Sequence, residues 1–422
     1  MAPVLPFRAL LYHPRFGPEM GRIVAPPYDV IGENQRSELE SSHPKNVVRL
    51  ILPGEAGREG DGTFYAGAAG LLKKWREEGT LQQDPGACLY PYRQTFRGPD
   101  GSESSRLGFF GALEMEEARQ GAPLPHEKTL EGPRRDRTRL IAACRANLSP
   151  IFLIHPDESG RVGSSLEGAA TRPALFRFSD PQGVTHELWR LDDRASIDEI
   201  RSAMGGDWTL IADGHHRYES AQAVMRDFPE EAGARRVLAF FCSLKDRGFR
   251  IFPIHRLVRS LDAARAADLR RSLTERMTAT ALPAGADPED LLLMLRKGGE
   301  GTFGAVLPAG PPLILKSRPS PAPGAGPALE DLDTVVLQRE VLSGILGISP
   351  ADAERGAVGF TPDAREAFRQ VRQGEAAAAF LLNPLRIDSV IRAARSGLRL
   401  PQKSTYFFPK VFTGLVIRPF ES

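Results

Sequence analysis

The sequence predicts a mixed α/β protein with more than one domain. Short apolar runs typical of buried strands alternate with segments whose apolar residues recur at helical spacing. The chain has 422 residues, which is enough for two or three domains with sizeable cores. Its 41 glycines and 35 prolines predict many turns between these elements. Because the apolar content of 41% is ordinary for a globular protein, we expect a loop-rich α/β fold.

Residues 1–120 are expected to form an N-terminal α/β region. Residues 25–31 cannot be helical at Pro26 and Pro27 and are predicted to form a rigid loop. The further elements predicted in this region are a strand at 46–52, a helix at 63–78, and strands at 88–96 and 106–113.

Residues 121–258 are expected to form a central α/β core. Its predicted elements, in order, are a helix at 133–145, a strand at 151–155, a helix at 164–171, strands at 176–178 and 186–191, a helix at 196–204, a strand at 210–212, a helix ending near 228, and strands at 237–243 and 249–254.

Residues 259–422 are expected to form a C-terminal α/β region. Its predicted elements are helices at 261–276 and 288–297, strands at 302–307 and 312–316, helices at 334–346 and 362–372, a strand at 376–382, a helix at 386–394 and a final strand ending at 417.

The chemically densest motif is the run Asp213-Gly214-His215-His216-Arg217, between a buried strand and a helix. Free backbone N–H groups and the helix dipole favour an anion at such a helix start, and glycine lets the backbone approach a ligand. Arg217 offers a planar fork to phosphate oxygens, and Asp213 suits a Mg²⁺ ion or a hydroxyl proton. The alternative is structural, because Asp-Gly is a common turn and Asp a common helix cap. The motif predicts a phosphate site.

Two further pairs of residues are candidates for the same chemistry. His126 and Glu127 lie in a proline-flanked loop, where polar side chains can bind ligands or transfer protons. His255 and Arg256 are expected at the end of a strand, where side chains often face a ligand cleft. A solvated loop and a surface ion pair are the respective structural alternatives.

The cluster Lys403-Ser404-Thr405 combines a lysine with two hydroxyls that suit phosphate binding. It is not a P-loop, because the required glycines and the following helix are missing. A plain turn beside a strand is the alternative. Asp29 follows two prolines in a stiff loop that suits a fixed carboxylate, and a helix cap is its alternative.

The overall charge gives no electrostatic case for nucleic-acid binding. Lysine plus arginine number 55 and aspartate plus glutamate 53, so the net charge is +2. The local basic run formed by Arg134, Arg135, Arg137 and Arg139 is interrupted by Asp136. For this run the sequence favours a solvated face over a phosphate patch.

The cysteines and the apolar runs predict a cytoplasmic protein. Cys88, Cys144 and Cys242 are far apart and form no metal or disulfide pattern. No run approaches eighteen apolar residues, and the N-terminus has no signal-peptide hydrophobic region. We therefore expect no membrane segment and no dedicated metal site.

Six motifs together resemble one family over nearly the whole chain. They are Pro6-Phe-Arg-Ala9, Ala25-Pro-Pro-Tyr-Asp-Val30, Leu124-Pro-His-Glu127, Asn147-Leu-Ser-Pro150, Ala212-Asp-Gly-His-His-Arg-Tyr-Glu219 and Pro401-Gln-Lys-Ser-Thr-Tyr406. The combination is specific and resembles domain-of-unknown-function family 1015 of bacteria and archaea. This resemblance brings little biochemistry with it.

A second resemblance covers about residues 186–228 and concerns the ParB/sulfiredoxin superfamily. The strand, Asp-Gly-x-His-Arg turn and helix look like the nucleotide-phosphate motif of its CTP-binding ParB proteins, sulfiredoxins and free serine kinases. The resemblance implies that Gly214 is the motif glycine and that His216 and Arg217 hold phosphates. It also implies that Asp213 matches the aspartate of the serine kinases. The implied fold is a ParB/sulfiredoxin-like nucleotide-binding core with N- and C-terminal α/β elaborations.

Departures from the motif distinguish between these activities. Sulfiredoxin needs a cysteine after the motif glycine, where this chain has His215. ParB proteins continue into a helix-turn-helix with a basic surface, whereas strands are predicted after Phe228. The resemblance therefore implies phosphoryl transfer from ATP, ADP or CTP with Mg²⁺ to a small hydroxyl metabolite such as free serine. Asp213, His216, Asp29 and Glu127 are the catalytic candidates.

The alternative function is a non-catalytic ParB-like switch that binds CTP or ATP through the same residues. For either function, the phosphate-binding candidates are Gly214, His215, His216, Arg217, His126, His255, Arg256, Lys403, Ser404 and Thr405. The expected partners are the nucleotide and a small molecule, with no nucleic acid. The sequence leaves the oligomeric state open, a homodimer included.

Overall fold

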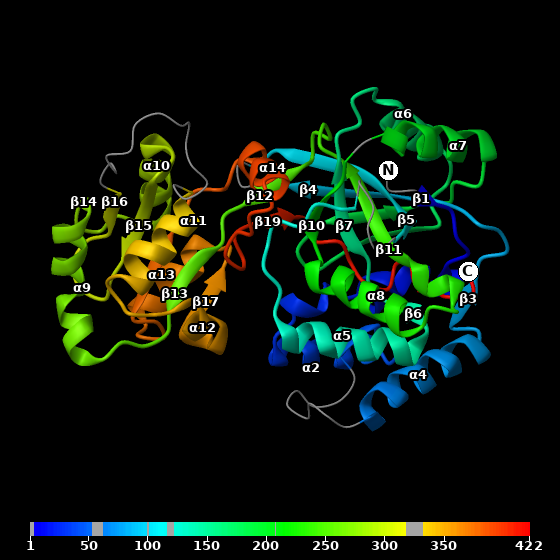
Figure 1. The fold of residues 1–422 in the computed structure, drawn as a ribbon, viewed down its shortest axis with the longest axis horizontal. Helices are drawn as coiled ribbons and strands as arrows, with labels where there is room; N and C mark the ends of the chain where they lie inside the picture. The colour runs from blue at the N-terminus through cyan, green and yellow to red at the C-terminus, as the bar shows by residue number, and fades with distance from the viewer. Residues whose placement is uncertain (1–3, 53–61, 99–100, 116–121, 207, 318–331) are drawn as a thin grey trace. The chain divides into compact units, whose positions relative to one another are not determined.

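The protein is a mixed α/β chain that divides by internal contacts into two compact units (Figure 1). A computed structural model describes residues 4–52, 62–98, 101–115, 122–206, 208–317 and 332–422. Unit 1 comprises residues 1–125, 129–250 and 409–422, and unit 2 comprises residues 126–128 and 251–408. Residues 1–120 therefore share one unit with most of the segment 121–258. None of the helices in the described ranges is long and apolar enough to cross a membrane.

Unit 1 is built on an eight-stranded mixed sheet. Its order is β10-β7-β11-β5-β4-β9-β8, with β1 also paired to β5. Only β7 and β11 among these neighbours run parallel. The strands are β1 (Val4–Leu5), β4 (Tyr90–Arg97), β5 (Glu103–Glu114), β7 (Ile151–His155), β8 (Phe176–Ser179), β9 (Thr185–Leu188), β10 (Leu210–Asp213) and β11 (Arg236–Ser243).

The helices at residues 161–169, 194–203 and 215–227 use apolar stripes to cover this sheet. In α8, Tyr218, Ala221 and Met225 join a core that includes Leu153 and Phe241 of the sheet. Figure 1 shows α5 and α8 alongside one another, and their residues are in contact. The helices are α2 (Glu33–Ser42), α3 (Val48–Ile51), α4 (Gly62–Glu77), α5 (Glu131–Cys144), α6 (Arg161–Ala169), α7 (Arg194–Ala203) and α8 (His215–Asp227).

Unit 2 contains a six-stranded antiparallel sheet with the order β14-β16-β15-β18-β13-β17. Successive side chains of a strand point to opposite faces. Accordingly, Phe380 packs in one core, while Ala379 and Leu381 pack in another. The strands are β13 (His255–Val258), β14 (Thr278–Ala281), β15 (Thr302–Val306), β16 (Leu313–Lys316), β17 (Val358–Thr361) and β18 (Ala378–Leu381).

Helices supply the second layer of each core in unit 2. One core takes apolar residues from α9 and α11, and the other from α10 and α13. The helices are α9 (Ala263–Arg276), α10 (Pro288–Gly298), α11 (Asp333–Val336), a π-helical continuation (Leu337–Ser343), α12 (Pro350–Asp352), α13 (Ala364–Arg372) and α14 (Ile387–Arg395).

Two local predictions are wrong. Residues 46–52 form the short helix α3 instead of a strand, because the Asn46 Oδ1 accepts a hydrogen bond from Val48 N at 2.8 Å and starts a turn. His255 and Arg256 open β13 instead of closing a strand, because the preceding strand ends at Phe252, before Pro253.

Candidate functional site

The Asp213 motif lies where the edge strand β10 turns into α8, as the sequence predicts. The pairing of β10 with β7 is irregular between Ile211 and Asp213, and such bulges re-aim side chains at strand ends. Gly214 has φ 89° and ψ 32°, a conformation that L-residues rarely adopt. It begins α8 without a side-chain cap, so the first N–H groups of α8 form a helix start suited to an anion.

Two cations converge on the Asp213 carboxylate. Arg217 Nη2 lies 2.5 Å from Asp213 Oδ2, and Lys410 Nζ lies 2.6 Å from Asp213 Oδ1. Arg217 also donates to the Pro150 carbonyl. The Arg217 and Lys410 side chains are only 6% and 10% exposed, so little water screens these charges. Lys410 is absent from the predicted site, because no motif connects it to a turn almost two hundred residues away.

Two buried side chains of the sheet fix the backbone beside Lys410. Arg106 Nη2 donates to the Pro409 carbonyl at 2.6 Å, and Gln94 Nε2 donates to the Lys410 carbonyl at 2.9 Å. The guanidinium of Arg106 lies 4.8 Å from the centre of the Phe152 ring. Strands β4 and β5 thus hold the chain segment that carries Lys410 to Asp213.

The segment after residue 128 covers the first turns of α8. His216 Nε2 accepts a hydrogen bond from Leu130 N at 2.8 Å, and Thr129 Oγ1 donates to Glu219 Oε2 at 2.7 Å. His215 is 7% exposed at the start of α8.

The loop with Asp29 approaches the same region through its neighbour Tyr28. The Tyr28 ring lies 4.2 Å from the Arg137 guanidinium. Burial and the Asp29 charge raise the pKa of Tyr28 to about 12, although Arg137 and Arg217 act to lower it. Asp29 is exposed in the short helix Tyr28–Val30.

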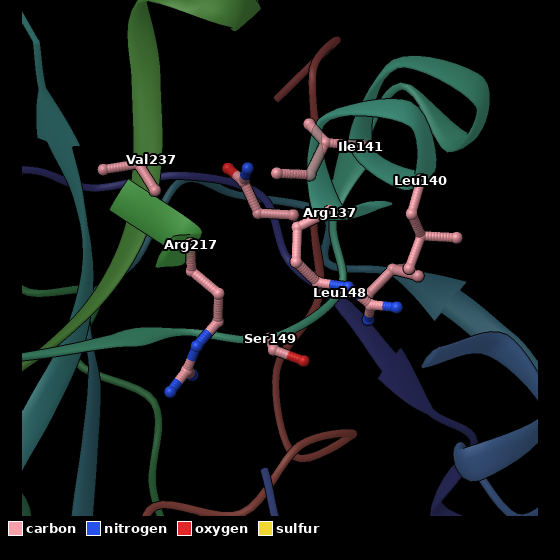
Figure 2. A pocket seen from close by; sticks show the side chains of 8 residues that line it. Arg137, Leu140, Ile141, Leu148, Ser149, Arg217 and Val237 are labelled. Atoms are coloured by element: carbon pink, nitrogen blue, oxygen red, sulfur yellow. The ribbon is translucent and has the colours of Figure 1, made fainter. Parts of the chain in front are cut away.

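Arg134, Arg135 and Arg139 are exposed, as predicted for a solvated basic face, whereas Arg137 is buried. Its side chain is 6% exposed, it pairs with Asp136, and its Nη1 donates to the Ile51 carbonyl at 2.8 Å. With Arg217 and Ser149 it lines a cavity of about 20 Å³ (Figure 2). That space suits one water molecule and not a nucleotide.

The other residues predicted for the site form a second cluster, which belongs to unit 2. They are His126, Glu127, His255, Arg256, Lys403, Ser404 and Thr405. Glu127 Oε1 accepts from Lys403 N at 3.1 Å, and His126 Nε2 lies 3.0 Å from Thr405 Oγ1. Ser404 Oγ donates to the Pro401 carbonyl at 2.6 Å. We call residues 401–405 the Lys403 turn. Lys403 itself has φ 54°, an uncommon value for a residue with a Cβ.

Arg256 and His255 support the Lys403 turn from β13. Arg256 donates to the carbonyls of Ile254, Lys403 and Gln402 at 2.8, 3.1 and 3.2 Å. Burial lowers the pKa of Arg256 to about 10 and that of His255 to about 4. His255 is therefore neutral near pH 7, and its Nδ1 accepts from Leu382 N. Phosphate roles for these residues, and a catalytic role for Glu127, stay predictions.

The described residues contain no cluster of three His, Cys, Asp or Glu side chains that could hold a metal ion. A Mg²⁺ ion held by Asp213 would therefore need further ligands, such as the oxygens of a bound phosphate.

The fold is similar to several solved structures. A free serine kinase variant in complex with AMP has a TM-score of 0.37 and 15% identity, with 67% of this chain and 82% of that chain covered. A conserved hypothetical protein from Pyrococcus furiosus has a TM-score of 0.38 and 15% identity, covering 70% and 91%. SbnI from Staphylococcus aureus, truncated at its C-terminus, has a TM-score of 0.35 and 11% identity, covering 71% and 86%.

A comparison with curated proteins found no match. A family model described as protein of unknown function DUF1015 matches residues 4–335, which is well over half of the chain. The chain therefore belongs to the DUF1015 family.

Proposed function

We propose that the Asp213 turn binds the phosphates of a nucleotide and that the protein transfers a phosphoryl group to a small hydroxyl metabolite. The observation that carries this proposal is the convergence of Lys410 and Arg217 on Asp213, at a helix start opened by Gly214. Buried cations and the backbone N–H groups at a helix start are groups that stabilise phosphates.

In this proposal, phosphate oxygens compete with Asp213 for the two cations. Arg217 offers a fixed fork because the Pro150 carbonyl orients its guanidinium. Lys410 supplies a compact charge, and His216, in the first turn of α8, is proposed to contact a phosphate oxygen. Catalysis would rest mainly on positioning and charge neutralisation, as is usual in phosphoryl transfer.

Mg²⁺ would neutralise the nucleotide phosphates when bound with them. Asp213 is the protein ligand proposed for this ion, and phosphate oxygens would complete the coordination. Asp213, once released from its cations, and Asp29 are the groups proposed to orient the acceptor hydroxyl. The sequence resemblance to free serine kinases makes L-serine the first acceptor to test.

A nucleotide-binding switch is the second candidate function. It is favoured by one observation, namely that both carboxylate oxygens of Asp213 already accept from cations. A carboxylate used this way acts as a counter-ion that a ligand displaces, and no chemistry is required of it.

Phosphorus NMR with Mg²⁺, L-serine and a mixture of ATP, ADP and CTP tests both candidates. A kinase produces a new phosphomonoester signal and loses it in Lys410→Met. We expect Lys410→Met to weaken nucleotide binding by about tenfold, roughly 1.4 kcal/mol. Lys245→Met is the matched control, because Lys245 is half-exposed and pairs with Glu158.

The variant Asp213→Asn distinguishes the two candidate functions, a phosphotransferase and a nucleotide-binding switch. Because it frees both cations, we expect nucleotide binding to stay equal or to tighten, while turnover is lost. Nucleotide signals that broaden without product in the wild-type protein would favour the switch. Unchanged spectra in wild type and variants would leave the Asp213 turn a structural element.

A further inference from the structure

Unit 2 contains a cavity of about 540 Å³ that is separate from the Lys403 turn. It is lined by the C-terminal end of α10, the start of α11 and the start of α14. This volume is in the range of small-molecule sites. The polar and charged side chains on its wall are Arg296, Glu300, Asp333, Asn383, Arg386 and Ser389.

Asp333 is the buried acidic group of this cavity. It is 5% exposed, and its Oδ1 accepts a hydrogen bond from Gly301 N at 2.6 Å. Burial, with the charge of Glu300 adding to it, raises the pKa of Asp333 to about 6. A buried carboxylate that has no cationic partner within the described ranges is costly, so its presence in a cavity favours a functional role over a structural one.

Cations lie on the wall of the same cavity without neutralising Asp333. Arg296 and Arg386 are exposed, and within the ranges that the structure describes no ion pair joins either of them to Asp333. Arg386 also begins α14, whose first N–H groups have no side-chain cap. The cavity therefore offers one buried negative group and a separate positive region.

The loop between α10 and β15 leaves its backbone open to a ligand. Gly299 and Gly301 have φ of 70° and 76°. Among the residues that the structure describes, none lies within 4 Å of a Cβ built at either position, so this part of the chain leaves the space beside the loop open. Here glycine is required by the backbone conformation, and it also lets a ligand approach closely.

We infer that this cavity binds a small metabolite with an amino group at one end and an anionic group at the other. The amino group would donate to Asp333, and the phosphate or carboxylate would contact Arg386 and Arg296. Charge-assisted hydrogen bonds at both ends would select a zwitterion over a simple amine or a simple anion. The inference does not depend on the nucleotide site, whose residues belong to unit 1.

Isothermal titration of the full chain with O-phosphoethanolamine tests this inference. This probe carries one ammonium and one phosphate, whereas ethanolamine and inorganic phosphate each carry only one of these groups. We expect saturable binding of the whole probe and binding weaker by roughly tenfold or more for each half.

Three variants assign the binding to this cavity. Asp333→Asn and Arg386→Gln should each weaken probe binding by about tenfold or more. Lys297→Gln should leave binding unchanged, because Lys297 follows Arg296 on α10 but does not line the cavity. Asp333→Asn keeps an oxygen that can accept from Gly301 N, so the variant should fold, as thermal unfolding can verify.

Binding that is absent in the wild-type protein would overturn the inference. Equal affinity of the wild-type protein and Asp333→Asn for the probe would also overturn it. The same holds if ethanolamine or inorganic phosphate binds as tightly as O-phosphoethanolamine.

Discussion

The Asp213 turn in unit 1 and the Lys403 turn in unit 2 both gather basic residues at a bend of the chain, but the charges have different partners. At the Asp213 turn, Lys410 and Arg217 each contact a carboxylate oxygen. At the Lys403 turn, Arg256 donates to three backbone carbonyls.

The contacts of Asp213 with its two cations are ones that a ligand could replace, whereas the contacts of Arg256 hold the backbone of the Lys403 turn. A ligand phosphate can take the place of the Asp213 carboxylate, because both are anions with similar oxygen acceptors. The Gln402 and Lys403 carbonyls are part of the Lys403 turn itself, so loss of their contacts with Arg256 would disturb that turn. Basic clusters that look alike in sequence thus differ in the partners of their charges.

The largest effect expected is on stability, for Arg256→Met. Three carbonyls lose a buried donor, so the free energy of unfolding should fall by about 3 kcal/mol. Urea denaturation measures this change. Arg259→Met is the matched control, because Arg259 is exposed near the end of the same strand. Equal stability of the two variants would mean that Arg256 does not clamp the turn.

Acid should weaken both units through buried histidines. Burial lowers the pKa of His155 in unit 1 and of His255 in unit 2 to about 4. Each is neutral when folded and protonates at a higher pH when unfolded, so stability is lost as the pH falls from about 6.5 towards 4. The loss at pH 5 relative to pH 8 should be about 2 kcal/mol per histidine.

Replacement of His155 by leucine tests this assignment. Its Nδ1 is buried and has no hydrogen-bond partner among the described residues, so His155→Leu should fold and should reduce the acid sensitivity. Unfolding free energies at pH 8 and pH 5 give the comparison. An unchanged difference between the two pH values would show that His155 does not contribute.

The backbone conformation at the two turns predicts how stability changes when a Cβ is added at Gly214 or removed at Lys403. Gly214→Ala should cost about 1–2 kcal/mol, because φ is 89° and the new Cβ would lie 2.9 Å from Arg217 Nε. Lys403→Gly should cost about 1 kcal/mol or less, because glycine relieves the conformation at φ 54°. Thermal unfolding of both variants gives the order, and a larger loss for Lys403→Gly would contradict this account.

Much of the fold follows from local patterns in the sequence. The strand at 151–155 and the helix from Ala263 to Arg276 are expected from apolar spacing, and the structure contains both. Asn46 is the counterexample, because its side-chain hydrogen bond starts a helix in a segment that the sequence predicts to be a strand.

The sequence by itself determined the mixed α/β class and the Asp213 turn, because glycine, apolar strands and helical spacing act over a few residues. Only the tertiary structure decided which cations reach that turn. Arg137 is buried although its neighbours suggest an exposed face, and Lys410 reaches Asp213 because buried Arg106 and Gln94 hold its backbone. Such contacts depend on the pairing of strands far apart in the chain, and no local pattern records them.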